Sequence, residues 1–246
     1  GTAVINLEDP LLKGLAGRLP CKTVLYGRAS GALVSAKDIV AYPAPLRFNL
    51  VLGKDVYPVT LSTMGDMQVQ NAMAAAAVAY ALGIGAQDIV AGLESFKPAA
   101  MRMEVRVRPD ETVLVNDAYN ANPSSMRASI ESFCLSYPDR PKWLVLGDMR
   151  ELGPTLARQE HDEMGRWIAA QSIDRVYLYG RDTRFILQGL TAQKFEGVVE
   201  RYRKKRYLID ALERSLSAAP KPAVLFKASR SLKLEQVTHA LSSLSS

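Results

Sequence analysis

"VLVNDAYNANPSS", residues 113–125, joins a strand, a polar loop and the start of a helix. Residues 113–115 are three apolar residues in succession, a pattern typical of a strand buried on both faces. Pro123 favours the first turn of a helix, which leaves unpaired backbone N–H groups there. Asp117 and two asparagines lie between these elements, so the strand ends by presenting carboxylate and amide groups at one place.

The same alternation of strand and helix continues through the rest of the chain. Strands are expected at 105–117, 142–147, 175–180 and 223–228, and helices at 124–137, 158–171, 183–190, 207–218 and 231–244. This alternation predicts a Rossmann-like α/β domain with a mostly parallel sheet. Polar loops follow three of the strands, at 116–123, 147–153 and 227–231. Because ligands bind at the carboxyl ends of parallel strands, we expect these loops to face one crevice.

The first hundred residues mix structure types. Strands are expected at 2–7 and 22–27, and helices at 10–17, 70–83 and 86–96. Residues 47–63 alternate around Gly53-Lys54-Asp55 and predict a β-hairpin. The helix at 70–83 is alanine-rich and ends at Gly83.

Composition limits the class of protein. Hydrophobic residues make up 48% and charged residues 23% of the 246 residues, a normal globular balance. We find no apolar run of the roughly 18 residues that a membrane span needs, and no signal peptide. The two cysteines and two histidines lack metal or redox spacing. We therefore expect a cytoplasmic protein with no membrane span and no metal site in this chain. Because Gly1 opens directly on strand-like residues, we expect the chain to be part of a longer protein.

The net charge of +6 is unevenly distributed, and residues 201–206 ("RYRKKR") carry much of the excess. Such a run could attract nucleic acid or a phosphorylated ligand. A solvated basic face beside a helix start is the favoured interpretation, because no stacking pattern or nucleic-acid module accompanies the run. We expect no nucleic-acid partner.

Four segments, taken in order, resemble a known family. "NDAYNANPSSM" (116–126), "VLGDMRELG" (145–153), "QEHDEMG" (159–165) and "KASRS" (227–231) are similar to motifs of the Mur ligases of peptidoglycan synthesis, in particular the MurF type. The resemblance covers nearly the whole chain. It implies that residues 1–101 are the latter part of the central ATP-binding domain and that residues 102–246 are the C-terminal domain.

The resemblance implies an ATP-dependent ligase of peptidoglycan precursor synthesis. In that family a substrate carboxylate takes the γ-phosphate of ATP, and an amine then attacks the acyl phosphate. The substrates would be UDP-N-acetylmuramoyl-tripeptide and D-alanyl-D-alanine, and Mg²⁺ would assist in the intact enzyme. A cytoplasmic monomer is expected.

The resemblance also assigns roles to residues. Those matching catalytic positions are Asp148, Asn120 and Lys227; those matching ATP-binding positions are Asn71, Gln68, Arg102, Asp117, Tyr119 and Asn122; those matching substrate-binding positions are Ser229, Arg230 and His161. Simpler roles compete with these. Asn71 could cap its helix and Asp148 could hold a turn, while the charged helix around His161 favours a solvent-exposed side chain.

The chain also departs from the family pattern. Asp66-Met67-Gln68 stands where the family has x-His-Asn, and Ala228 stands where glycine is usual, which is expected to narrow the backbone approach. No G-x-x-x-x-G-K-[ST] loop occurs. We therefore expect this chain alone to be inactive. The alternative is a non-catalytic, diverged paralogue that keeps a nucleotide- or peptide-binding pocket.

Overall fold

The computed structural model describes residues 1–42, 45–218 and 221–243. The chain forms two compact units, residues 1–98 and residues 99–246. The predicted fold class is confirmed: both units are α/β structures, and the second is built on a mostly parallel sheet.

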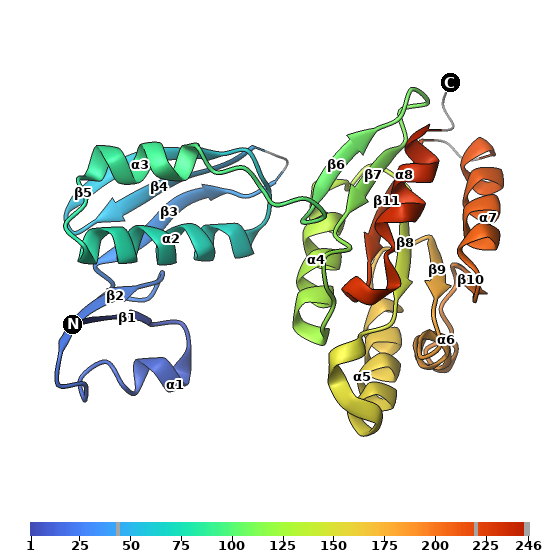
Figure 1. Ribbon diagram of the computed structural model, residues 1–246, viewed down its shortest axis with the longest axis horizontal. Coiled ribbons are helices and arrows are strands. Elements are labelled where there is room, and N and C mark those ends of the chain that lie inside the picture. The colour runs from blue at the N-terminus through green and yellow to red at the C-terminus, as the bar shows by residue number, and fades with distance from the viewer. Residues whose placement is uncertain (43–44, 219–220, 244–246) are drawn as a thin grey trace. The chain divides into compact units, whose positions relative to one another are not determined.

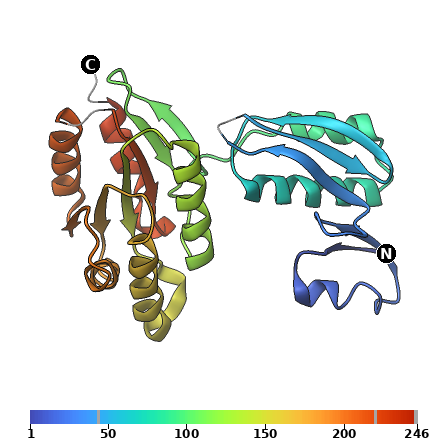
Figure 2. The ribbon, with the colours of Figure 1, turned by 180° about the vertical axis from the view of Figure 1, so that it is seen from behind.

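The first unit is a five-stranded sheet in the order β1-β2-β3-β4-β5. Its elements are β1 (Thr2–Asn6), α1 (Pro10–Lys13), β2 (Lys22–Tyr26), β3 (Val34–Val40), β4 (Leu46–Leu52), β5 (Asp55–Leu61), α2 (Asp66–Ala81) and α3 (Ala86–Glu94). The first three strands are parallel and the last three antiparallel. Helices α2 and α3 lie side by side against this sheet (Figures 1 and 2).

Two features of this unit test the sequence-based expectations. The hairpin is confirmed, because Leu52 pairs with Asp55 across the two-residue turn. Strand β3 was not expected. Its register shifts between Lys37 and Val40, and Asp38 has a φ of 53°, so the alternation of apolar and polar residues breaks within the strand.

The second unit carries the expected parallel sheet in the order β10-β9-β8-β11-β7-β6, with only β6 antiparallel to its neighbour. Its elements are β6 (Glu104–Val107), β7 (Val113–Asn116), α4 (Pro123–Ser136), β8 (Lys142–Gly147), α5 (Gly153–Ile168), β9 (Arg175–Tyr179), α6 (Thr183–Ala192), β10 (Val198–Tyr202), α7 (Lys205–Ser217), β11 (Ala223–Lys227) and α8 (Glu235–Ser243), with 3₁₀ turns at Arg150–Leu152 and Arg230–Leu232. Residue 244, the expected end of the last helix, lies outside the described residues.

Helices cover both faces of this sheet (Figure 1). Apolar residues of α4, α5 and α6 share one core with the sheet, and those of α7 and α8 share the other. Helices α5 and α6 cross in direct backbone contact: a Cβ at Gly165 would overlap the carbonyl oxygen of Ile186, and one at Gly189 would overlap that of Asp162. Strand β10 was not expected, because its sequence runs into the basic segment 201–206 and lacks a buried apolar run.

Candidate functional site

The strands of the second unit end at the same level. Asn116 of β7 pairs with Phe226 of β11, Lys227 of β11 pairs with Leu146 of β8, and the end of β8 is level with that of β9. The loops that follow β7, β8 and β11 therefore begin side by side at the carboxyl edge of the sheet, as the sequence predicted. Asp117, Asp148 and Lys227 all lie on this edge.

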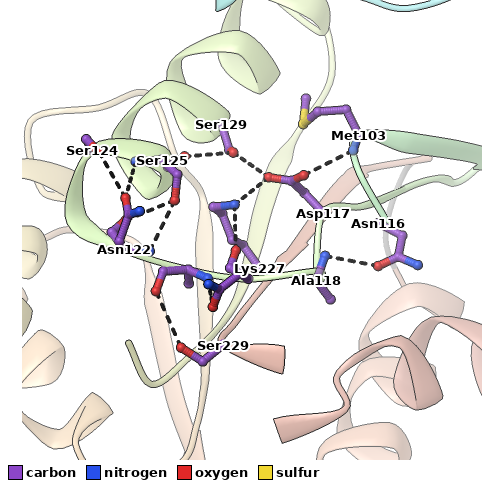
Figure 3. A network of polar contacts seen from close by, with 12 residues as sticks. Met103, Asn116, Asp117, Ala118, Asn122, Ser124, Ser125, Ser129, Lys227 and Ser229 are labelled. Carbon is purple, nitrogen blue, oxygen red and sulfur yellow. Dashed lines mark hydrogen bonds and ion pairs between the residues drawn. The ribbon is translucent and has the colours of Figure 1, made fainter. Parts of the chain in front are cut away.

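Asp117 and Lys227 form a buried ion pair at the centre of the edge. Lys227 Nζ lies 2.6 Å from Asp117 Oδ2, and the two side chains are 4% and 11% exposed. Ser129 Oγ donates to the same oxygen, and the Met103 N–H donates to Oδ1 (Figure 3). Lys227 also donates to the carbonyl of Asn120. Such a pair is retained in a protein interior when further hydrogen bonds satisfy both charges, so it braces the loop after β7 against β11.

The loop after β7 is held by its own amide groups. Asn122 Oδ1 accepts from the Ser125 N–H at 2.8 Å, and Ser125 Oγ accepts from the Asn122 N–H at 3.1 Å, a capping box at the start of α4 (Figure 3). Asn120 Oδ1 accepts from the Ala121 N–H, while its Nδ2 donates to Glu151 in the neighbouring loop. Much of the loop's unusual composition thus serves to shape the loop.

Asp148 is fully buried at the end of β8. Its carboxylate accepts from the backbone N–H groups of residues 181–183, at 2.9–3.1 Å, and so fixes the chain where α6 begins. Gly180 makes this possible, since it has a φ of 134° and a Cβ there would overlap the carboxylate. Arg150 Nη2 lies 3.2 Å from the same group. Asp148, assigned as catalytic by resemblance, therefore holds two loops together through its side chain.

Ser229 joins the three loops of the edge. Its N–H donates to the carbonyl of Asp148 at 3.1 Å, and its Oγ accepts from the Arg150 N–H at 2.8 Å. The same hydroxyl donates to the carbonyl of Ala121 in the loop after β7. Arg230 is half-exposed and paired with Glu235 at 2.7 Å. The φ angle of Ala228 is not positive, so alanine in place of the usual glycine causes no backbone strain at this position.

The expectation of a solvent-exposed His161 is wrong. Its side chain is fully buried on α5; Nδ1 lies 2.6 Å from the carbonyl of Ala157, and Nε2 accepts from the Met149 N–H at 3.0 Å. The ring is therefore the neutral Nδ1–H tautomer. Burial lowers the pKa of His161, against the opposing pull of the Ala157 carbonyl and of Asp148. His161 supports the loop after β8 from beneath.

Arg102 and Tyr119 form an exposed pair at the other end of the edge. The guanidinium lies 4.3 Å from the centre of the tyrosine ring. Met101 and Met103, on either side of Arg102, both have positive φ, at 61° and 52°. The Tyr119 N–H donates to the carbonyl of Met101. Strained backbone of this kind needs surrounding bonds to hold it, and here it fixes the position of Arg102.

Gln68 and Asn71 belong to the first unit. Helix α2 begins at Asp66, so Asn71 does not cap it. Asn71 is exposed and Gln68 is partly buried, and Asn71 Nδ2 donates to Gln68 Oε1 at 3.4 Å. They line a largely apolar groove of about 510 Å³ between α2 and α3. The groove also includes Ala75, Ala79, Ile89, Leu93 and Phe96.

Some residues of the site were missed at the sequence level. Ser129 could have been found, because it is a polar residue on the same buried helix face as Met126, Ile130 and Phe133. The Met103 N–H and Glu151 carry no comparable signal, since their contacts depend on how separate loops meet.

Comparisons with known proteins match this architecture. A model of the Mur ligase glutamate ligase domain matches residues 101–230, and a model of the Mur ligase middle domain matches residues 1–79. The chain belongs to the Mur ligase family.

Relatives of this Mur ligase chain include two named UDP-N-acetylmuramoyl-tripeptide--D-alanyl-D-alanine ligase. The Bacillus subtilis protein is 33% identical over 98% of this chain and 51% of its own length, and the Haemophilus influenzae protein is 31% identical over the same shares. A crystal structure of MurF from Acinetobacter baumannii aligns with a TM-score of 0.86, 28% identity, and coverage of 98% of this chain and 51% of that one. The structure of MurF ligase from Thermotoga maritima in complex with ADP aligns with a TM-score of 0.79 and 25% identity. The alignment covers 97% of this chain and 52% of that one.

The Mur ligase chain therefore spans about half the length of the relatives it matches. Among its described helices, none is both long and apolar enough to cross a membrane.

Proposed function

We propose that the protein containing this chain is a cytoplasmic, ATP-dependent ligase that adds D-alanyl-D-alanine to UDP-N-acetylmuramoyl-tripeptide. The names of the relatives support this substrate pair, and their similarity covers 98% of the chain. The ADP-bound relative supports a nucleotide site. The family resemblance of the loops at the carboxyl edge supports amide-bond formation over other uses of the fold.

The observation that carries the proposal is the junction at Ser229. The buried hydroxyl of Ser229 bonds to the loops that follow β7 and β8. On the same edge, Lys227 binds Asp117 and so connects the end of β11 to the loop after β7. Ligation needs two substrates held within reacting distance, and preorganised groups supply much of the rate. A rigid edge built from three loops provides such positioning.

This chain's residues would hold and orient the reactants. The reaction transfers the γ-phosphoryl group of ATP to a carboxylate; the amine then attacks the acyl carbon, phosphate leaves and the nitrogen loses a proton. Arg102 and Tyr119 offer an exposed cation and ring for a nucleotide. Asp117 accepts two donors on Oδ2 and one on Oδ1, which leaves one acceptor site of Oδ1 for a ribose hydroxyl.

The described residues form no preassembled metal centre. They hold no group of three or more carboxylate, histidine or cysteine side chains arranged to bind a metal. Asp117 and Asp148, the two buried carboxylates of the edge, are engaged by internal donors. We therefore expect the protein ligands of the Mg²⁺ ion to lie outside these residues.

The test uses the full-length protein with both substrates. Release of ADP should require UDP-N-acetylmuramoyl-tripeptide and D-alanyl-D-alanine together, and mass spectrometry should show the joined product. L-Alanine in place of the dipeptide is the matched control. ADP release without product, or product with L-alanine alone, would contradict the proposal. We also expect the 246-residue chain by itself to form no product in the same assay.

A diverged, non-catalytic paralogue is the second candidate. The observation that favours it is the replacement of the family's His-Asn by Met67 and Gln68, of which Met67 is exposed and cannot donate a hydrogen bond. Calorimetry distinguishes the two: a full-length protein that binds ATP or the dipeptide but forms no product would support the paralogue.

A further inference from the structure

Arg102 lies between two residues whose backbone is strained. Met101 and Met103 have φ angles of 61° and 52°, a conformation that costs free energy for any residue with a Cβ atom. Such a conformation persists only where surrounding contacts hold it. Because both neighbours of Arg102 are strained, the direction of its side chain depends on the bonds that keep these two residues in place.

Hydrogen bonds hold Met101 on both sides of its Cα atom. Its N–H donates to Glu104 Oε2 at 3.2 Å, and its carbonyl accepts from the Tyr119 N–H at 3.2 Å. The N–H of Met103 donates to Asp117 Oδ1 at 3.1 Å. Each strained residue therefore bonds through its N–H to one carboxylate, and Glu104 is the one that holds Met101.

Glu104 is itself held in place. It is the first residue of β6, where it pairs with Asn116, the last residue of β7. Arg106 donates to its Oε1 from Nε at 3.0 Å and from Nη2 at 2.7 Å, which leaves Oε2 for Met101. Although burial raises the pKa of Glu104, hydrogen bonds from the Arg106 side chain and the Met101 N–H lower it overall. Glu104 is therefore an ionised acceptor at neutral pH, and its charge strengthens the bond to Met101.

Arg102 and Tyr119 both depend on the position of Met101. The Arg102 guanidinium lies 4.3 Å from the centre of the Tyr119 ring, and the Tyr119 N–H is bonded to Met101. Rotation of the backbone at Met101 would therefore separate the cation from the ring. A long side chain loses rotamer entropy when it binds a ligand, and a fixed backbone reduces that cost. Loss of the Glu104 bond would therefore weaken binding by Arg102 without removing any group that contacts the ligand.

We propose that Glu104 is a positioning residue: its bond to the Met101 N–H keeps Arg102 stacked on Tyr119, in the orientation that binds ATP. This inference rests on the proposed function. Arg230 Nη1 also contacts Met101, at 3.4 Å from its sulfur, but a thioether is a weak acceptor, so the carboxylate bond is the stronger restraint. In this role Glu104 does not contact ATP. It acts through Arg102, and its effect should disappear when the Arg102 side chain is absent.

The experiment measures the KM of ATP in the full-length enzyme. Glu104→Ala removes the acceptor of the Met101 N–H, so we expect the KM of ATP to rise about fivefold, while kcat and the KM values of the other two substrates stay within about twofold. Glu104→Gln keeps an acceptor oxygen and should stay within about twofold of the wild type in the KM of ATP. Glu94→Ala is the matched control, because Glu94 Oε1 likewise accepts one backbone N–H, that of Thr60.

A double-variant cycle tests whether Glu104 acts through Arg102. In an Arg102→Ala background, Glu104→Ala should change the KM of ATP by less than about twofold. The same rise in both backgrounds would overturn the inference, as would an unchanged KM of ATP in Glu104→Ala or an equal rise in Glu104→Gln. Glu104→Asp, one methylene shorter, replaces the alanine variant if that variant does not fold, and should give the same rise.

Calorimetry with ATP keeps the inference separate from turnover. The affinity for ATP should fall in Glu104→Ala by the same factor as the KM of ATP rises. A full-length protein that shows this loss but forms no product would overturn the proposed function alone. An enzyme that forms the product, and whose affinity for ATP is the same with glutamate or alanine at position 104, would overturn the inference alone.

Discussion

Two buried aspartates hold the two halves of one sheet edge by different means. Asp117 is neutralised by a lysine at 2.6 Å, with a hydroxyl and one N–H adding to the pair. Asp148 is held chiefly by three backbone N–H groups at a helix start, and its arginine partner is half-exposed. The first half therefore depends on a charge that a single substitution can remove. The second depends on dipoles that belong to the backbone.

The largest effect is expected from breaking the ion pair. Lys227→Met leaves the Asp117 charge buried and unpaired, which should lower the free energy of unfolding by about 3–5 kcal/mol. Both tryptophans, Trp143 and Trp167, lie in the second unit, so their fluorescence in urea reports on it. The double variant with Asp117→Asn should recover part of the loss, and Lys204→Met, on the surface, should change little. A single variant as stable as the wild type would contradict the pairing.

Substitution of Asp148 should lower the free energy of unfolding less than substitution of Lys227 does. Asp148→Asn keeps one acceptor oxygen but turns an amide toward N–H donors, so we expect a loss of about 2–3 kcal/mol in the same urea titration. Asp139→Asn, an exposed carboxylate of the same unit, is the control. A loss equal to that of Lys227→Met would remove the distinction between the two halves.

The cap of α4 sharpens the comparison on the Asp117 side. Asn122→Ala removes the acceptor for the Ser125 N–H and should cost about 1 kcal/mol, whereas Asn122→Asp keeps the cap and should cost almost nothing. Thermal unfolding followed by circular dichroism is sufficient to resolve this difference. Equal losses in both variants would show that the loop, and not the cap, governs stability here.

The smallest effect at neutral pH concerns His161, beneath the Asp148 half. Its folded pKa is lowered, so it contributes stability above the ordinary histidine pKa of 6.5 and loses that contribution as the pH falls below it. Unfolding free energies measured from about pH 7.5 to 5 in a His239→Gln background isolate this residue. His161→Gln should flatten the slope, and an unchanged slope would contradict a buried neutral ring.

Much of this edge could be predicted from the sequence. The predictions that failed did so for physical reasons. Apolar strands followed by polar loops correctly predicted the parallel sheet and the meeting of Asp117, Asp148 and Lys227. The composition of its helix misled the interpretation of His161, although its spacing to Met164 and Ile168 places it on the apolar face. The partners of the two aspartates depend on tertiary contacts between loops, which no local pattern encodes.

The direct contact between α5 and α6 has a consequence for how this half of the molecule can vary. His161 stands on α5 and Asp148 holds the start of α6, so the two helices and the loops bonded to these residues form a single block. With no side chains between the crossing backbones, the helices have no room to slide. A side chain at Gly165 or Gly189 would therefore push the two helices apart and displace the loops that His161 and Asp148 hold.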